Sequence, residues 1–100
     1  MTRFRHMLMM HFNDDVTEEQ KTALLDEFAR MPEAMSYIRR YEFGLDLGNL
    51  GPDTPDFGLV ADFDSEEDWR RYVDNPDHQR LVAMVRELSV GLTRVQYLVG

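Results

Sequence analysis

The chain has 100 residues, which suits one domain, and 43% of them are hydrophobic, which is enough for a packed core. Its net charge of −8 argues against nucleic acid or an anionic membrane surface as a partner, because both select clustered Lys and Arg. Cysteine is absent, which excludes disulfides, a thiolate nucleophile and a Cys-ligated metal.

Residues 3–12 alternate with a period of two and predict a strand. One face carries Phe4, His6, Leu8, Met10 and Phe12, and the other carries Arg3, Arg5, Met7, Met9 and His11. Both faces are apolar in the middle, so both need cover, and a second subunit is the simplest cover for the face without helices. The apolar run 7–10 is too short for a signal peptide or a membrane span, so we expect a cytoplasmic protein.

A capping box at Thr17–Gln20 predicts a helix over about residues 18–31, which we expect Pro32 to end. Residues 38–47 predict a second strand, and residues 57–63 predict a third. The segment 48–56 between them is rich in glycine and proline and predicts a loop.

Ser65 is a predicted N-cap for the next helix, which Asn75-Pro76 interrupts. A further helix then runs to about Leu88, and residues 93–99 predict a final strand. The order is β-α-β-β-α-α-β, and we expect one domain over residues 1–100. Four strands with helices on one face predict an α+β sandwich of ferredoxin-like type.

The corner around Asn75-Pro76 is the best candidate for chemistry. His78 falls in the first turn of the second helix, where the helix dipole favours a neutral imidazole. Tyr72 closes the preceding helix, and a phenol beside a neutral imidazole is a plausible proton-transfer pair. The alternative is a well-capped corner with a surface histidine.

Other site types find little support in the sequence. His6 and His11 point to opposite strand faces, so the three histidines do not easily form one metal site, although His6, His78 and a carboxylate remain an open combination. We expect no metal and no cofactor. There is no glycine-rich phosphate loop and no Gly-x-Ser-x-Gly nucleophile elbow. If His6 lies beneath the helices, it rims an apolar pocket with Tyr72 and His78.

Four patterns together resemble the stress-responsive dimeric α/β barrel (Dabb) family. They are His6 on the first strand, Thr17-Glu18-Glu19-Gln20, Phe63-Asp64-Ser65-Glu66-Glu67 and Tyr72-x-x-x-Pro76-x-His78. The family more often has His where Asn75 stands, and Asn is the better N-cap.

The resemblance implies a four-stranded antiparallel sheet and a homodimer in which two sheets face each other as a dimeric α/β barrel. A plant polyketide cyclase of this family suggests His78 as base, with His6 and Tyr72 assisting. By the same likeness, the substrate-binding wall would comprise Leu25, Phe28, Leu59 and Tyr97.

Three functions remain open from the sequence. The first is a cofactor-free lyase or cyclase that acts by general acid–base chemistry on an aromatic or polyketide-like substrate. The second is a non-catalytic dimeric protein of ligand binding or stress response, with a hydrophobic small-molecule ligand or a filled interior. The third is a cofactor-free monooxygenase or isomerase of the wider dimeric barrel superfamily.

Overall fold

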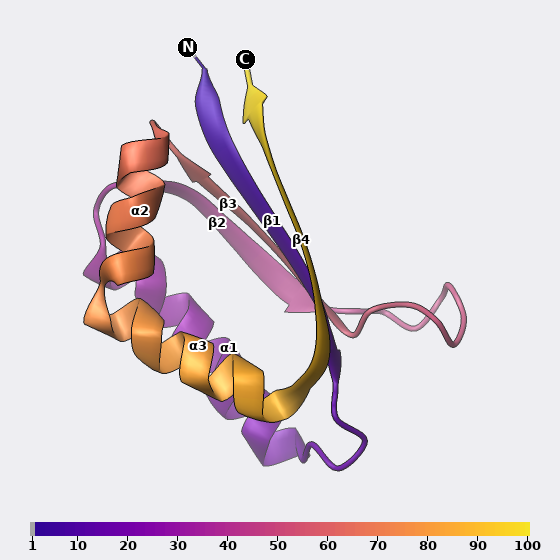
Figure 1. The fold of residues 1–100 in the computed structure, drawn as a ribbon. Helices are drawn as coiled ribbons and strands as arrows, with labels where there is room; N and C mark the ends of the chain where they lie inside the picture. Colours follow the sequence, from indigo (N-terminus) through magenta and orange to yellow (C-terminus); the bar gives the residue numbers. More distant parts are fainter. Residues whose placement is uncertain (1) are drawn as a thin grey trace.

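The computed structural model describes residues 2–100 and has the predicted order β-α-β-β-α-α-β (Figure 1). The elements are β1 (Arg3–Phe12), α1 (Glu18–Ala34), β2 (Ile38–Leu45), β3 (Phe57–Phe63), α2 (Glu66–Asp74), α3 (Pro76–Leu88) and β4 (Ser89–Val99). The strands form one antiparallel sheet in the order β2-β3-β1-β4, and the helices cover one of its faces. This arrangement confirms the predicted ferredoxin-like α+β fold.

Side-chain caps fix where each helix begins. The Thr17 hydroxyl accepts from the Gln20 N–H at 3.1 Å, and the Gln20 side chain accepts from the Thr17 N–H at 2.9 Å, which completes the capping box. Ser65 caps α2, and Asn75 caps α3 by accepting from the Asp77 N–H at 2.9 Å. Each cap satisfies a backbone donor that has no partner within its own helix.

Two boundaries differ from the sequence prediction. Helix α1 continues through Pro32 to Ala34, because a proline in the last turn removes a single hydrogen bond and the Met35 N–H still bonds to the Met31 carbonyl. Strand β4 begins at Ser89 rather than at residue 93, because α3 ends at Leu88 and leads directly into the strand.

The core lies between the helix layer and the strands β2, β3 and β1. Its strand residues come from one face of the sheet, and Met10, Ala61 and Phe63 among them are fully buried. Phe28 of α1 packs against Phe57, with ring centroids 4.7 Å apart. Strand β4 lies at the edge beside β1, beyond most of this core.

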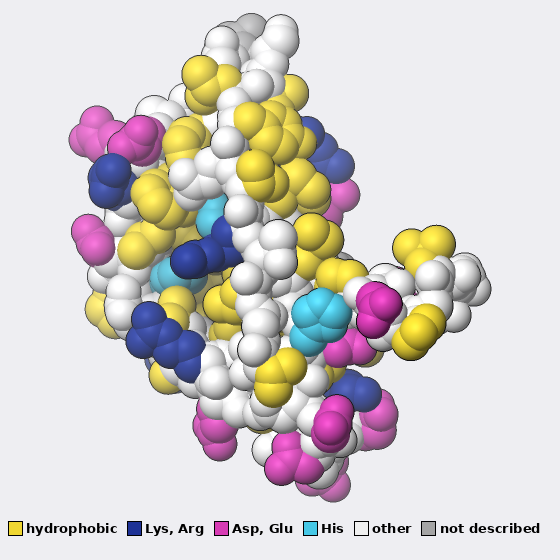
Figure 2. All heavy atoms as spheres, turned by 45° about the vertical axis from the view of Figure 1, so that its right-hand side comes forward, with side chains coloured by type: hydrophobic (Ala, Val, Ile, Leu, Met, Phe, Trp, Pro, Cys, Tyr) yellow, Lys and Arg dark blue, Asp and Glu magenta, His cyan; other side chains and the backbone are white. Residues whose placement is uncertain are grey.

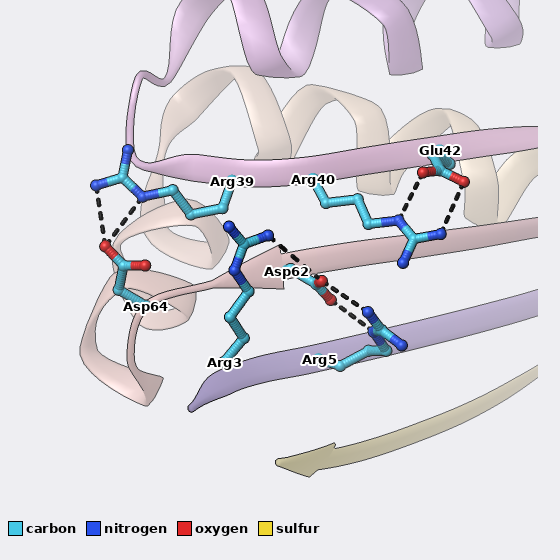
Figure 3. A network of polar contacts seen from close by, with 7 residues as sticks. All are labelled: Arg3, Arg5, Arg39, Arg40, Glu42, Asp62 and Asp64. Carbon is cyan, nitrogen blue, oxygen red and sulfur yellow. Dashed lines mark hydrogen bonds and ion pairs between the residues drawn. The ribbon is translucent and has the colours of Figure 1, made fainter. Parts of the chain in front are cut away.

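The face of the sheet away from the helices, called here the open face, carries an ion-pair network (Figure 3). Arg5 donates two hydrogen bonds to Asp62, at 2.7 and 2.9 Å, and the Asp62 carboxylate is only 1% exposed beneath it. Arg40 pairs with Glu42 nearby on β2. Within residues 2–100, no helix has the length and apolar composition needed to cross a membrane.

Candidate functional site

A cavity of about 340 Å³ lies between the helices and the sheet on the side of β1 and β4. Apolar side chains from β1, β3, α1 and α3 form much of its wall, and His6, Tyr72 and His78 all line it. Figure 2 shows imidazole and basic side chains gathered around this hollow. The volume is within the range of pockets that bind small molecules.

His6 enters the cavity from β1, where it lies on the helix-covered face opposite Ala61 of β3 and Gln96 of β4. The Gln96 side-chain amide lies 3.0 Å from Nδ1 of His6. An amide N–H donates to that nitrogen, so the proton of His6 is on Nε2. Burial, with smaller contributions from the charges of Arg94 and His78, lowers the pKa of His6 from 6.5 to about 4.

Tyr72 and His78 are brought together by the Asn75 corner. Their ring centroids are 4.1 Å apart. The Nδ1 atom of His78 lies 3.3 Å from the Val73 carbonyl, which only accepts, so Nδ1 carries the proton and Nε2 is the basic nitrogen. Burial lowers the pKa of His78, partly offset by this hydrogen bond.

The Tyr72 hydroxyl lies 2.8 Å from the hydroxyl of Tyr41 on β2, and both rings are largely buried. Burial raises the pKa of Tyr72 to about 12 and raises the pKa of Tyr41 further. Both phenols are therefore neutral at pH 7. The His78 ring packs against the Tyr72 ring, and this contact restrains the orientation of the imidazole.

The arrangement supplies two neutral imidazoles with opposite tautomers. His78 offers an unprotonated Nε2, and His6 offers an Nε2–H. One is a proton acceptor and the other is a hydrogen-bond donor, which is the pair needed to remove a proton next to a carbonyl group. No group of three His, Asp or Glu side chains placed to hold a metal ion occurs in residues 2–100.

The family profile described as the stress responsive A/B barrel domain, Dabb, matches residues 4–98. The chain belongs to the Dabb family. This result confirms the family resemblance that the first strand and the Tyr72–His78 corner suggested.

Solved structures with the same fold include a dimeric ferredoxin-like protein of unknown function from Thermobifida fusca. It is 32% identical to this Dabb domain, with a TM-score of 0.89, over 98% of this chain and 92% of that chain. A dimeric protein of unknown function from Bacteroides fragilis is 27% identical, with a TM-score of 0.76, over 95% and 94%. The hydroxynitrile lyase of Passiflora edulis is 13% identical, with a TM-score of 0.87, over 98% and 94%, and shows the fold alone. No curated protein sequence matches significantly.

Of the four wall residues expected from the family resemblance, Phe28 and Leu59 line the cavity of the Dabb domain. Leu25 packs at the edge of the core and does not line it. Tyr97 pairs with Arg5 on β1, so it lies on the open face, where its hydroxyl contacts the Met7 sulfur at 3.4 Å. The expected placement of Tyr97 in the pocket wall is therefore wrong.

Sequence reasoning missed Trp69, Arg86 and Arg94, which also line the cavity. The Trp69 ring packs against His6, with centroids 6.0 Å apart. Trp69 lies three residues before Tyr72 on α2, a helical spacing that is equally typical of core packing and gives no separate signal of a site. The two arginines gave no signal in a single sequence, because long basic side chains on a helix and an edge strand are typical of a solvated surface.

Proposed function

We propose that this Dabb domain binds a small apolar molecule in the cavity and acts on it as a cofactor-free lyase or cyclase. The observation that carries the proposal is the pair of neutral imidazoles of opposite tautomer, His78 and His6, which line one apolar cavity. An apolar cavity with a few polar groups of perturbed pKa is the usual form of a small-molecule site. The substrate class that suits it is an aromatic or polyketide-like carbonyl compound.

The proposed step begins when Nε2 of His78 takes a proton from the carbon next to a substrate carbonyl. The electron pair of the C–H bond forms a C=C bond as the π pair of the carbonyl moves onto its oxygen, and the Nε2–H of His6 donates a hydrogen bond to the developing oxyanion. Tyr72 holds the His78 ring in place and borders the same cavity. In a cyclisation, the enolate carbon then attacks a second carbonyl, and the alkoxide formed there takes the proton back from Nε2 of His78. A lyase that cleaves the same bond runs these steps in reverse.

The test is proton exchange at an aryl methyl ketone. Wild-type protein is incubated with acetophenone in D₂O, and loss of the methyl signal is followed by NMR. We expect His78→Ala to lower the exchange rate by about 100-fold with little change in melting temperature. His11→Ala, on the open face, is the matched control and retains the rate. Binding of acetophenone without exchange above buffer would support the non-catalytic ligand-binding alternative instead.

We further propose that the chain forms a homodimer through the open face. Large apolar side chains remain exposed there, including Met9 at 39%, Val95 at 50% and Tyr97 at 45%. Exposed apolar patches of this kind mark association surfaces. The relatives from T. fusca and B. fragilis are described as dimeric, which supports the same assembly here.

Sedimentation velocity tests the dimer. Wild-type protein is expected at twice the chain mass of 11.8 kDa, and Met9→Lys is expected to shift the population towards the monomer. Glu67→Lys places the same side chain on α2, outside the open face, and is expected to remain dimeric. A wild-type protein that sediments as a monomer at micromolar concentration would contradict the proposal.

A further inference from the structure

The basic side chains of this chain are almost all paired. Of its 11 Lys and Arg residues, nine make an ion pair with Asp or Glu within residues 2–100. The two that do not are Arg86 and Arg94, and both line the cavity. The two arginines without an acidic partner in the described part of the chain therefore belong to the lining of one cavity.

The cavity has the opposite charge to the whole molecule. The chain carries 19 Asp and Glu residues, yet none of them lines the cavity in the described part of the chain. The other polar groups in its wall are the two neutral imidazoles, the Tyr72 phenol, the Trp69 indole and Gln79. The lining therefore has a formal charge of +2 in a protein of net charge −8, and its local field favours an anion.

The two arginines come from the two layers that enclose the cavity. Arg86 lies in the last turn of α3, and Arg94 lies on β4, where it pairs with Leu8 on the helix-covered face. Arg94 is near enough to His6 for its charge to lower the pKa of that imidazole. Both arginines are exposed and line the cavity, so they lie at its opening. Figure 2 shows basic side chains bordering the hollow and hydrophobic side chains within it.

We propose that Arg86 and Arg94 form a carboxylate-binding subsite at the mouth of the cavity, so that the ligand is an organic acid whose apolar body fills the interior. The inference rests on the proposed small-molecule cavity and specifies its ligand class. A guanidinium group matches a carboxylate in geometry and donates paired, charge-assisted hydrogen bonds to it. The carboxylate then anchors one end of the ligand and leaves its apolar portion beside His6 and His78.

Trp69 is the only tryptophan and lines the cavity, so its fluorescence reports occupancy. The probes are octanoate, 1-octanol and octylamine at pH 7, which share one chain length and carry a negative, a zero and a positive charge. Octyl phosphate is the fourth probe. We expect octanoate to bind about tenfold tighter than 1-octanol and octylamine to bind weakest. The preference should shrink in high salt, because exposed charges are screened.

The Arg86→Gln/Arg94→Gln variant is expected to lose this preference while keeping its affinity for 1-octanol. Arg80→Gln, also on α3 but in ion pairs with Asp77 and Glu27, is the matched control and keeps it. If wild-type protein binds 1-octanol at least as tightly as octanoate, the carboxylate subsite is wrong and the apolar cavity still stands. A strong preference for octyl phosphate over octanoate also overturns the carboxylate assignment. No fluorescence response to any probe overturns both the subsite and the ligand-binding cavity.

Discussion

Acid should destabilise this protein through His6, and the effect is large enough to measure. The folded state holds the pKa of His6 at about 4, against 6.5 in an accessible imidazole. Between about pH 4 and pH 6.5, the His6 imidazole is therefore protonated in the unfolded chain and stays neutral in the folded protein. Stability is lost as the pH falls from about 6.5 towards 4, and this loss is complete below the lower value.

The magnitude follows from the two pKa values. Between pH 7 and pH 5 the difference in proton binding is worth about 1.8 kcal/mol. Screening by solvent at this half-buried site reduces the expected loss to about 1 kcal/mol. His78, whose pKa is also lowered by burial, adds in the same direction.

Urea unfolding at pH 7 and pH 5 isolates the His6 contribution. We expect His6→Gln to show a smaller difference between the two free energies of unfolding than wild type, by about 1 kcal/mol. Gln96→Ala keeps the imidazole but removes a hydrogen bond that favours its neutral form, so it should reduce the wild-type difference by less than His6→Gln does. Equal pH dependence in wild type and His6→Gln would refute the reasoning that the cavity shields His6.

Three further predictions concern the structure around the cavity and the open face. Tyr41→Phe and Tyr72→Phe should each lower the free energy of unfolding in urea by about 1 kcal/mol. The double variant should lower it by little more than either single variant, because each substitution already breaks the one hydrogen bond between the two hydroxyls. Additive losses would show that the two hydroxyls do not interact. Asn75→Ala should cost about 1 kcal/mol through loss of the α3 cap, whereas Asn75→Asp keeps the acceptor and should stay near wild type. Arg5→Gln should lower the urea midpoint more than Arg40→Gln, because the Asp62 carboxylate is 1% exposed and the Glu42 carboxylate is 63% exposed. The opposite order would mean that solvent reaches Asp62.

Local signals predicted most of the fold. The capping box at Thr17 and the N-caps at Ser65 and Asn75 are each read from two or three adjacent residues, and the structure places all three helix starts there. Boundaries set by tertiary context were harder to predict. Pro32 indicates a helix end, yet a proline in a last turn disturbs too little to end it.

The face assignment of β4 shows where a period of two is insufficient. Alternation divides the strand into two sets but does not say which set meets the helices. The more apolar set, which includes Val95 and Tyr97, lies on the open face. Pairing with β1 decides this, because Arg5 opposes Tyr97 and His6 opposes Gln96. The apolar set would be misassigned by any rule that places hydrophobic residues under the helices.

The part of the candidate site that depends on local patterns could be predicted from the sequence. His6, Tyr72 and His78 follow from one strand face and one helix corner, and the structure places them around one cavity. Their chemical roles remain a proposal. The arginines at the mouth depend on how α3 and β4 approach each other, which no local pattern encodes.

Strand β4 lies at the edge of the sheet and contributes side chains to the cavity but none to the buried core in the described part of the chain. Its side chains on the helix-covered face, such as Leu92, Arg94 and Gln96, are exposed and border or adjoin the cavity, while the packed core lies under the other three strands. Substitutions at these positions can therefore change what the cavity accepts with little loss of stability. A single strand at the margin gives this small domain a region where specificity can diverge or be engineered, one residue at a time, on an unchanged scaffold.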